Sequence, residues 1–436
     1  MQFYSTKNKN VRVGMAEALM RGIAPDGGLL MPTQIPQVSP NFLKTIRKRT
    51  FPEIATYLTS LFFQDDLPKE TIENICTKSF DFTLPLTKLS NNLVMLELFH
   101  GPTLAFKDFG ARFMARITSY FARQTKKHIT VLVATSGDTG SAVAAGFYKV
   151  PNIDVILLYP KGKVSPMQEK QLTTMGGNIT ALEIKGSFDD CQKLVKRAFG
   201  DYALRSRFTL TSANSINVAR LLPQIFYYFY VYAKGESLGK PLVFSIPCGN
   251  LGNLTAAILA KHMGLPIARL IAATNRNDVF TRYIKTGIFT PKLSKTTLSN
   301  AMDVGNPSNF VRIVELYKNN LSKIRTDITS QSFSDSQTMT AIKEVWQKYQ
   351  YIMDPHSAVA YLGLAQYQQK HPRINGIALA TGHPAKFPEL IENILHKKIP
   401  IPKGLKQALL GKKQTVELSN RFAEFKKYLL KQSVDS

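Results

Sequence analysis

The sequence predicts an α/β protein whose parallel sheets are covered by helices on both faces. Two observations predict this fold class. From about residue 92 onward, short apolar runs alternate with longer segments that show helical spacing. Residues that favour helix caps mark the ends of several of these longer segments. Because parallel strands need a crossover between them, this alternation is typical of sheets with helices on both sides.

The expected strands are apolar runs with the length of buried strands. They fall at residues 94–98, 129–134, 153–158, 179–184, 242–246, 269–273 and 376–380. The chain has 436 residues, of which 44% are hydrophobic, so it can form about three domain-sized units with substantial cores.

The expected helices lie between these strands. One apolar face recurs every four residues, at Phe109, Phe113, Ile117 and Phe121. A second helix is expected to begin at Ser165, with Pro166 at its first position and Gln168 as capping-box partner. Gly176 and Gly264 stand where helices would end.

The chain divides into three parts by pattern. Residues 1–85 are mostly helical in pattern and contain a Pro-Asp-Gly-Gly turn, so we expect an N-terminal, mainly helical lobe. Residues 86–395 carry the strand–helix alternation. Residues 396–436 are rich in lysine and proline, which predicts a basic C-terminal tail at the periphery.

The charge balance favours anionic partners. The chain has 56 Lys and Arg against 30 Asp and Glu, a net charge of +26. The charge alone does not distinguish a metabolite, a nucleic acid or a membrane surface. A nucleic-acid binder would gather basic residues and aromatics on one face, whereas here the basic residues recur along the whole chain. We therefore expect a small-molecule partner and no specific nucleic acid.

The cysteines, the N-terminus and the apolar content of the chain predict a cytoplasmic protein. The three cysteines, Cys76, Cys191 and Cys248, are far apart, so neither a disulfide framework nor a metal site is indicated. The N-terminus has no apolar core of the signal-peptide kind. The most apolar stretch, residues 218–233, contains Arg220 and Pro223 and is too short and polar to span a membrane.

The first chemical motif is the segment His-Gly-Pro-Thr-Leu-Ala-Phe-Lys-Asp-Phe at residues 100–109. It places Lys107 at the start of a helix, after a strand and a Gly-Pro turn. Partial burial and the positive end of a helix both lower the pKa of a lysine, and such a lysine can form a Schiff base. An isolated lysine in this position is more often an ordinary surface residue.

The second motif, Thr-Ser-Gly-Asp-Thr-Gly at residues 135–140, follows a strand and opens a helix of small residues. Its backbone N–H groups and hydroxyls form a site suited to a carboxylate or phosphate. The alternative is a well-capped turn between strand and helix.

The third motif, Pro-Cys-Gly-Asn-Leu-Gly-Asn-Leu at residues 247–254, again connects a strand to a helix. Its two glycines allow the backbone to approach an anion closely. It matches neither the Walker A loop nor GxGxxG.

The fourth motif, Ala-Thr-Gly-His-Pro-Ala-Lys-Phe at residues 380–387, also lies at the end of a strand, and Thr381 could simply cap a helix there. Each motif is modest alone. Together, a Schiff-base lysine, an anion-binding turn and a phosphate loop at the carboxyl ends of strands are what an enzyme that uses pyridoxal phosphate (PLP) requires.

With these motifs the sequence resembles the threonine synthase family, in particular its bacterial and fungal branch. The matching stretches are APDGGLLMP, FHGPTLAFKDF, ATSGDTGSAVA, SPMQEKQ, SANSINVARLLPQIFYYF, AATNRNDVF, TLSNAMDVGNPSNF, DPHSAVAY and TGHPAKF. They extend over nearly the whole chain. The resemblance implies a fold-type-II PLP enzyme of the tryptophan-synthase-β kind, with two doubly wound α/β subdomains in residues 86–395 and the cofactor between them.

The resemblance also implies residue roles. Lys107 is the lysine that binds the cofactor, Thr381 bonds its pyridine nitrogen, and Asp138 lies near its ring hydroxyl. The cofactor phosphate is held by Gly249, Asn250, Leu251, Gly252 and Asn253. The substrate carboxylate is bound by Ser136, Gly137 and Thr139. No metal is expected.

Some positions depart from the family pattern. The phosphate loop of close relatives usually reads Ser-Gly-Asn-Phe-Gly-Asp, and here Cys248, Leu251 and Asn253 replace its Ser, Phe and Asp. Gly382 replaces a common Ala. An Asn is usual at the position of Asp138 in related fold-type-II enzymes. Backbone donors survive such changes, so PLP binding is still expected.

The implied reaction is the last step of threonine biosynthesis, in which O-phosphohomoserine and water become L-threonine and phosphate by γ-elimination and β-addition of water. Lys163 and Asn217 are the candidates for the substrate phosphate, although a solvated lysine and a capping Asn are equally good interpretations. The expected assembly is a monomer or homodimer. Two other enzymes remain as alternatives: a phospho-lyase that omits the water addition, and a threonine dehydratase.

Overall fold

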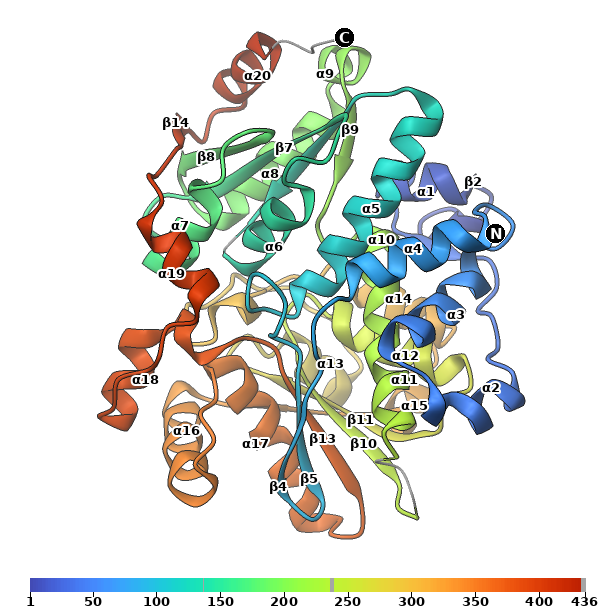
Figure 1. Cartoon of the computed structure of the whole chain (residues 1–436), viewed down its shortest axis with the longest axis vertical. Coiled ribbons are helices and arrows are strands. Elements are labelled where there is room, and N and C mark those ends of the chain that lie inside the picture. Colours follow the sequence, from blue (N-terminus) through green and yellow to red (C-terminus); the bar gives the residue numbers. More distant parts are fainter. Residues whose placement is uncertain (136, 236–238, 433–436) are drawn as a thin grey trace.

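The computed structural model describes residues 1–135, 137–235 and 239–432. Two largely parallel sheets lie one above the other in Figure 1, each flanked by helices, and a small N-terminal lobe packs beside them. The fold class predicted from the alternation of strands and helices is confirmed. All seven expected strands are present, with ends that differ by at most two residues.

The larger sheet has the strand order β12-β11-β10-β13-β5-β4. All neighbouring strands are parallel except β4, which is antiparallel to β5. Its strands are β4 (Leu86–Ser90), β5 (Leu93–Glu97), β10 (Leu242–Pro247), β11 (Ile267–Thr274), β12 (Ile328–Ser332) and β13 (Asn375–Ala380). The central strands are buried on both faces, which explains why they appear in the sequence as continuous apolar runs.

Helices from the second half of the chain surround this sheet. They are α12 (Gly252–His262), α13 (Val279–Thr286), η3 (Asn300–Met302), α14 (Phe310–Leu316), α15 (Leu321–Asp327), α16 (Asp335–Tyr349), α17 (Pro355–Lys370), η4 (Pro384–Lys386) and α18 (Pro388–Leu395). Helix α17 lies on β10, β11 and β13. Gly363 of α17 permits this contact, because a Cβ there would lie 2.9 Å from the Ser245 hydroxyl.

The second sheet has the order β14-β8-β7-β6-β9 and is parallel throughout. Its strands are β6 (Ile129–Ala134), β7 (Ile153–Pro160), β8 (Ile179–Lys185), β9 (Thr209–Ser212) and β14 (Val416–Ser419). The accompanying helices are α5 (Lys107–Thr125), α6 (Asp138–Phe147), α7 (Pro166–Thr173), α8 (Phe188–Gly200) and α9 (Tyr202–Arg207). The next three, α10 (Val218–Leu221), η2 (Leu222–Ile225) and α11 (Phe226–Ala233), pack against α5, α12 and the N-terminal helices. Helix α7 begins with the capping box expected at Ser165 and Gln168.

The N-terminal lobe contains the expected helices and a small antiparallel sheet that the sequence did not reveal. Its helices are α1 (Met15–Arg21), α2 (Pro40–Thr45), η1 (Ile46–Lys48), α3 (Phe51–Phe63) and α4 (Lys69–Ser79). The sheet consists of β1 (Gln2–Ser5), β2 (Arg12–Gly14) and β3 (Leu30–Pro32), in the order β2-β1-β3. Phe51 and Phe80 make edge-to-face or tilted contacts with Phe109 of α5, so the lobe shares a core with the part of the chain that contains α5.

The C-terminal segment, expected as a basic tail, contributes a strand to the second sheet. It contains α19 (Lys403–Leu410), β14 and α20 (Phe422–Lys431). Strand β14 pairs with β8, and Phe425 and Leu429 of α20 are buried against the same subdomain. The lysines that suggested a tail lie largely on the outer surface, while a few apolar side chains anchor the segment.

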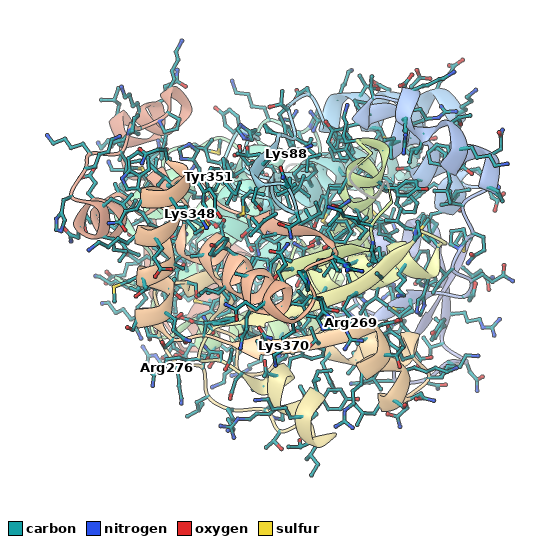
Figure 2. The ribbon with its side chains drawn as sticks, turned by 90° about the horizontal axis from the view of Figure 1, so that it is seen from below. Lys88, Arg269, Arg276, Lys348, Tyr351 and Lys370 are labelled. Carbon is teal, nitrogen blue, oxygen red and sulfur yellow. The ribbon has the colours of Figure 1, made fainter. Side chains whose placement is uncertain are left out.

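Basic side chains are distributed over separate elements. Figure 2 labels several on one face, and they belong to β4, β11 and the loop after it, α16 and α17: Lys88, Arg269, Arg276, Lys348 and Lys370. Within the described ranges, no helix is long and apolar enough to cross a membrane.

Candidate active site

Three of the sequence motifs follow adjacent parallel strands and therefore meet at one edge of the larger sheet. Strand β13 lies between β5 and β10, and the three strands run in the same direction. Their carboxyl ends lead to the Lys107 loop, to Thr381 and to the glycine-rich loop at 248–253. Such an edge is where open α/β sheets bind ligands.

Lys107 is the first residue of α5 and is partly exposed to solvent. The protein that surrounds its amine lowers the pKa of Lys107 to about 8, because burial disfavours the ammonium and the nearby cations Arg220 and Lys386 repel it. Asp138 opposes this effect only in part. Within the described chain the amine makes no hydrogen bond or ion pair. The lowered pKa increases the fraction of unprotonated amine compared with an ordinary lysine, which suits a lysine that forms a Schiff base, and this role of Lys107 stays a prediction.

Asp108 supports the loop that carries Lys107. It is fully buried, and both its oxygens accept hydrogen bonds from Thr103, one from the backbone N–H at 2.9 Å and one from the hydroxyl at 2.7 Å. Burial raises the pKa of Asp108 to about 6 even though these bonds favour the carboxylate. Gly101 is required for this arrangement, since a Cβ there would lie 2.5 Å from an oxygen of Asp108.

Thr381 lies beside the Lys107 loop. The backbone N–H of Phe106 donates to the carbonyl oxygen of Thr381 at 2.9 Å, and His383 N–H donates to the carbonyl of Leu104 at 3.0 Å. The Thr381 hydroxyl makes no hydrogen bond within the described chain. The cap of η4 is His383, whose side chain accepts from Ala385 N–H. The capping interpretation of Thr381 is therefore not what the structure shows, and its hydroxyl is available to a ligand.

Asp354 connects Thr381 with the glycine-rich loop. It is completely buried and accepts hydrogen bonds from the side chains of His356 and Ser357, and the Ser357 hydroxyl in turn accepts from Thr381 N–H at 3.2 Å. The other nitrogen of His356 accepts from Ala301 N–H at 3.1 Å, which places the ring proton on the nitrogen that faces Asp354. Asp354 also limits the position of Gly382, where a Cβ would lie 3.0 Å from its carboxylate.

The loop at 248–253 is shaped to present backbone N–H groups. Gly249 packs on the segment 301–302, where a Cβ would lie 2.9 Å from the Cα of Met302. Leu251 has φ +60°, an unusual conformation for a leucine, and Gly252 then begins helix α12. The Asn250 side chain donates to the Ser215 hydroxyl at 2.7 Å and accepts from Ser308 N–H. Its amide thus fixes the loop.

Asn253 provides the observation that tests whether an anion fits this loop. Its oxygen accepts hydrogen bonds from the hydroxyls of Tyr227 and Tyr228, at 2.5 and 2.6 Å. Its amide nitrogen is buried and has no partner among the described residues. An unpaired buried donor beside the N–H groups at the start of a helix matches the needs of a phosphate. The residues present therefore fit the phosphate of PLP.

The motif at 135–140 lies at the carboxyl end of β6, in the second sheet. Ser136 is outside the described residues. The Thr135 hydroxyl accepts from the N–H groups of Gly137 and Gly140, at 3.1 and 2.8 Å, and so folds the turn that begins α6. Gly137 has φ +142°, and a Cβ there would lie 2.6 Å from the Gln168 side chain. Thr139 is partly exposed and faces no partner within the described chain.

Asp138 has a partner that the sequence did not reveal. It is buried and forms an ion pair of 2.5 Å with Lys386, whose side chain is completely buried. Burial alone would raise the pKa of Asp138, but the charge and hydrogen bond of Lys386 and the amide of Gln168 lower it to about 2. Asp138 is therefore a carboxylate with a fixed counter-ion.

Arg220 is a second residue that sequence reasoning missed. It is buried, and one terminal nitrogen donates to the Ala213 carbonyl, while its Nε has no partner among the described residues. No carboxylate pairs with it in the described chain; burial lowers its pKa to about 10, and the charge of Asp108 opposes the change. Gly110 of α5 accommodates it, since a Cβ there would lie 2.9 Å from the Arg220 Nε. The signal was present as an arginine within the apolar stretch 218–233.

Of the two residues expected to contact the substrate phosphate, one has no free donor and the other is exposed to solvent. Asn217 is the N-cap of α10; its amide donates to the carbonyls of Leu19 and Ser212 and accepts from Ala219 N–H, so it has no free donor. Lys163 is exposed on the turn between β7 and α7 and makes no side-chain hydrogen bond or ion pair within the described chain. The geometry favours the capping and solvated interpretations.

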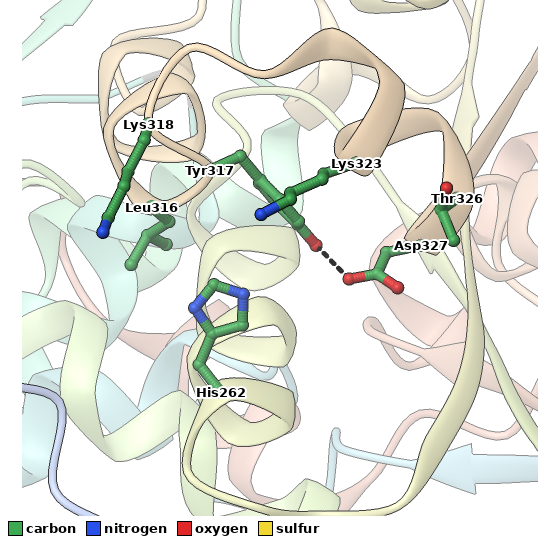
Figure 3. Close-up of a pocket in the computed structure, with 7 residues that line it drawn as sticks. All are labelled: His262, Leu316, Tyr317, Lys318, Lys323, Thr326 and Asp327. Carbon is green, nitrogen blue, oxygen red and sulfur yellow. Dashed lines mark hydrogen bonds between the residues drawn. The ribbon is translucent and has the colours of Figure 1, made fainter.

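A separate surface pocket of about 330 Å³ lies at the opposite end of α12 from the glycine-rich loop. Figure 3 shows Lys318 and Lys323 above His262, with the Tyr317 hydroxyl bonded to Asp327. Asp327 is also paired with Lys261 at 2.9 Å. A helix C-terminus disfavours anions, so this pocket lacks the features that make the site at the N-terminus of α12 suitable for a phosphate.

Known proteins are similar to this chain over nearly its whole length. Residues 83–379 match the family model described as "Pyridoxal-phosphate dependent enzyme". Residues 2–80 match "Threonine synthase N terminus", and residues 357–429 match "Threonine synthase, C-terminal". The threonine synthase of Haemophilus influenzae is 44% identical over 432 residues, which cover 99% of this chain and 100% of that protein.

Solved structures are similar over the same length. The crystal structure of threonine synthase from Escherichia coli superposes with a TM-score of 0.93 at 42% identity and covers 99% of both chains. PLP-bound threonine synthase from Brucella melitensis has a TM-score of 0.92 at 33% identity and covers 98% of both. The cofactor of this chain is accordingly PLP. A lysine, a free hydroxyl and a glycine-rich loop lie at adjacent strand ends, and the full-length matches show that the chain belongs to the threonine synthase family.

Proposed function

We propose that this enzyme converts O-phosphohomoserine and water into L-threonine and phosphate, as the last step of threonine biosynthesis in the cytoplasm. One observation carries the proposal within the structure. The Lys107 amine, with its lowered pKa, lies in the field of Arg220, a buried cation that lacks a carboxylate partner. A site of this kind suits an amino acid that carries a phosphate.

The cofactor would be held at both ends by residues that follow the carboxyl ends of strands in the larger sheet. Lys107 would bind it covalently, the Thr381 hydroxyl would meet its pyridine nitrogen, and the loop 249–253 would hold its phosphate. Bound PLP supplies an electron sink for the carbon atoms of an amino-acid substrate. A neutral hydroxyl at the pyridine nitrogen, rather than a carboxylate, does not favour protonation of that nitrogen.

Lys107 would also move protons. Its pKa of about 8 lies near neutrality, so the amine Nζ can accept a proton from a substrate carbon and return it to a neighbouring one. The position of Lys107 supports this role, because the Asp108–Thr103 bonds hold the loop that carries it, while its amine lies over the Phe106 ring and makes no hydrogen bond or ion pair within the described chain.

The turn at the start of α6 would bind the substrate carboxylate. Ser136, Gly137 and Thr139 are the residues proposed for this, through N–H groups and hydroxyls at the positive end of the helix. The Thr135 bonds to Gly137 and Gly140 support the proposal, because they hold the turn in one conformation before a ligand arrives.

Arg220 would bind the substrate phosphate. Its Nε is a buried donor without a partner among the described residues, and a guanidinium can bond two phosphate oxygens at once. Lys163 remains a candidate from the sequence, but it is exposed and is not joined to the cluster by any contact within the described chain. Asn217 has no donor to offer, so we do not place it in the phosphate site.

The deciding experiment follows both products from O-phosphohomoserine. Purified enzyme is incubated with this substrate, and threonine and phosphate are measured in the same samples. Equal amounts of the two products support the proposal. Phosphate without threonine would instead support the phospho-lyase alternative, and release of neither product would contradict both. The matched control is a Lys107→Ala variant, from which neither product is expected.

A further inference from the structure

Lys386 and Asp138 form a buried ion pair that joins the two sheets. Lys386 belongs to η4, after the end of β13 in the larger sheet, whereas Asp138 begins α6, after the end of β6 in the second sheet. The ammonium and the carboxylate oxygen are 2.5 Å apart, and the two side chains are 0% and 7% exposed. Figure 1 shows the two sheets as separate layers, so this pair spans the interface between them.

Each charge has further partners that define its position. The Lys386 ammonium also donates to the carbonyl oxygen of Thr103 at 3.1 Å. The same oxygen of Asp138 that accepts from Lys386 also accepts from the Gln168 amide at 2.9 Å. Breaking a buried pair by removal of one partner leaves an uncompensated charge, whereas removal of both partners together does not. The pair is therefore expected to respond to mutation as a unit.

Thr103 connects the pair to Lys107. Its carbonyl accepts from Lys386, while its N–H and hydroxyl both donate to Asp108, the residue that follows Lys107. The Lys107 loop thus contacts the start of α6 through Thr103, Lys386 and Asp138 in succession, and Gln171 of α7 donates to the same Thr103 carbonyl at 3.3 Å. The charges also act on Lys107 directly, since Lys386 is among the groups that lower its pKa and Asp138 opposes them.

We propose that the Lys386–Asp138 pair is a positioning unit that holds the Lys107 loop against the start of α6 and balances the charge around the Lys107 amine. Neither residue needs to contact substrate for this role. The inference deepens the proposed function, because it rests on Lys107 as the residue that carries the cofactor.

The test is a double-mutant cycle on the enzyme loaded with PLP. It compares wild type, Asp138→Asn, Lys386→Met and the double variant. Two properties are measured: the pH at which the cofactor's absorption band changes, and the midpoint of thermal unfolding. Gln168→Met is the matched control, because it removes a neutral donor to the same Asp138 oxygen without a change of charge.

The two single variants should shift the spectroscopic midpoint in opposite directions. Asp138→Asn leaves an extra positive charge near Lys107, which disfavours protonation there and should lower the midpoint by about one pH unit. Lys386→Met leaves an extra negative charge and should raise it by about the same amount. The double variant should return towards wild type in both the midpoint and thermal stability, and Gln168→Met should keep the wild-type midpoint.

The proposal would be overturned if the two single variants shifted the spectroscopic midpoint in the same direction, or if neither shifted it. It would also be overturned if the loss of thermal stability in the double variant equalled the sum of the losses in the two single variants. If a single variant does not fold, the double variant decides: a folded, cofactor-loaded double supports balanced charges, and an unfolded double refutes them. The thermal unfolding measurements do not depend on turnover or on which lysine carries the cofactor. A failure of the proposed function can therefore be distinguished from a failure of this proposal.

Discussion

The backbone N–H of Phe106 donates to the carbonyl oxygen of Thr381 at 2.9 Å. Lys107 begins its helix one residue after Phe106, so a single backbone bond relates the position of the nucleophilic amine to that of the Thr381 hydroxyl. The two residues are far apart in sequence, yet β5 and β13 are neighbours in the sheet and deliver them to the same edge. The predictions that concern the cofactor depend on this relationship.

Lys107 should be the lysine that carries the cofactor. The purified enzyme should be yellow, and reduction with borohydride followed by peptide mapping should place the label on Lys107, whose amine makes no hydrogen bond or ion pair within the described chain. Lys386 is the informative competitor, since it is buried near the same site but its ammonium is paired with Asp138. A label on Lys386 would show that the assignment from the motif is wrong.

Thr381→Val should retain PLP and slow turnover. The change removes one hydroxyl and little volume, and a neutral hydrogen bond is worth about 1 kcal/mol, which corresponds to roughly a fivefold loss of kcat. The measurement is kcat per bound cofactor, with cofactor content determined from absorbance. Thr381→Ser serves as the control, because it keeps the hydroxyl and should retain most of the rate. Equal rates in the Val variant and wild type would show that the hydroxyl has no part in the reaction.

The sequence was sufficient to predict the strands and the motifs at their carboxyl ends because both are local signals. Buried parallel strands appear as apolar runs, and a strand followed by glycines and a helix start indicates a loop that binds an anion. Short edge strands such as β9 and β14 carry too few residues to give a pattern. The antiparallel sheet of the N-terminal lobe was missed for the same reason, since β2 and β3 each have three residues.

The charged partners in the site could not be predicted because they depend on contacts between distant segments. Lys386 and Asp138 lie in helices that follow strands of different sheets, and nothing local to either residue indicates the other. Asn217 shows the opposite difficulty. It lies within a family motif, but its amide is used completely by the backbone of α1, β9 and α10. Whether a polar residue has a free donor is a property of the folded neighbourhood.

Arg220→Gln should weaken the use of substrate much more than Lys163→Ala. Loss of a charge-assisted contact to phosphate costs about 1.5–3 kcal/mol, so kcat/KM for O-phosphohomoserine should fall by roughly 10- to 150-fold. Lys163→Ala is the matched control, because Lys163 is an exposed cation, and its kcat/KM should stay within about twofold, as is usual for a weak surface charge. Loss of the cofactor spectrum in Arg220→Gln would indicate a structural defect, and Arg220→Lys then tests the charge alone. The reverse order of effects would assign the phosphate to Lys163, as the sequence suggested.

The stability of the cofactor-free protein should depend on pH through Lys107. The pKa of Lys107 is about 8 in the folded chain, against an ordinary value of 10.5. At pH values between these two pKa values, Lys107 keeps its proton in the unfolded chain but has lost it in the folded chain. The contribution of Lys107 to the free energy of unfolding should therefore increase as the pH rises through this range. Below a pH of about 8, Lys107 is protonated in both the folded and the unfolded chain, and the free-energy penalty for its buried charge does not change with pH. Urea unfolding of the apoprotein and of Lys107→Met, each measured below, within and above this range, isolates the contribution. Parallel pH profiles for the two proteins would contradict the lowered pKa.

Phe425→Ala should destabilise the second subdomain although it lies in the segment that the sequence presented as a basic tail. Phe425 is completely buried in the cluster that includes Leu182 and Leu418, so its truncation should leave a cavity beside strands β8 and β14. Replacement of a buried phenylalanine by alanine costs about 3–5 kcal/mol.

The matched control is Leu410→Ala, at a side chain that is 88% exposed in the same C-terminal segment, where a change within about 0.5 kcal/mol is expected. Thermal and urea unfolding measure both variants, and O-phosphohomoserine turnover below the transition shows whether the active site is preserved. Asp138 and the start of α6 follow β6 of this same sheet, so loosening its edge at β14 should lower the temperature at which activity is lost without a change in KM below it. If Phe425→Ala were as stable as Leu410→Ala, the C-terminal helix would contribute nothing to the core. In that case the segment would be the peripheral tail that its lysines suggested.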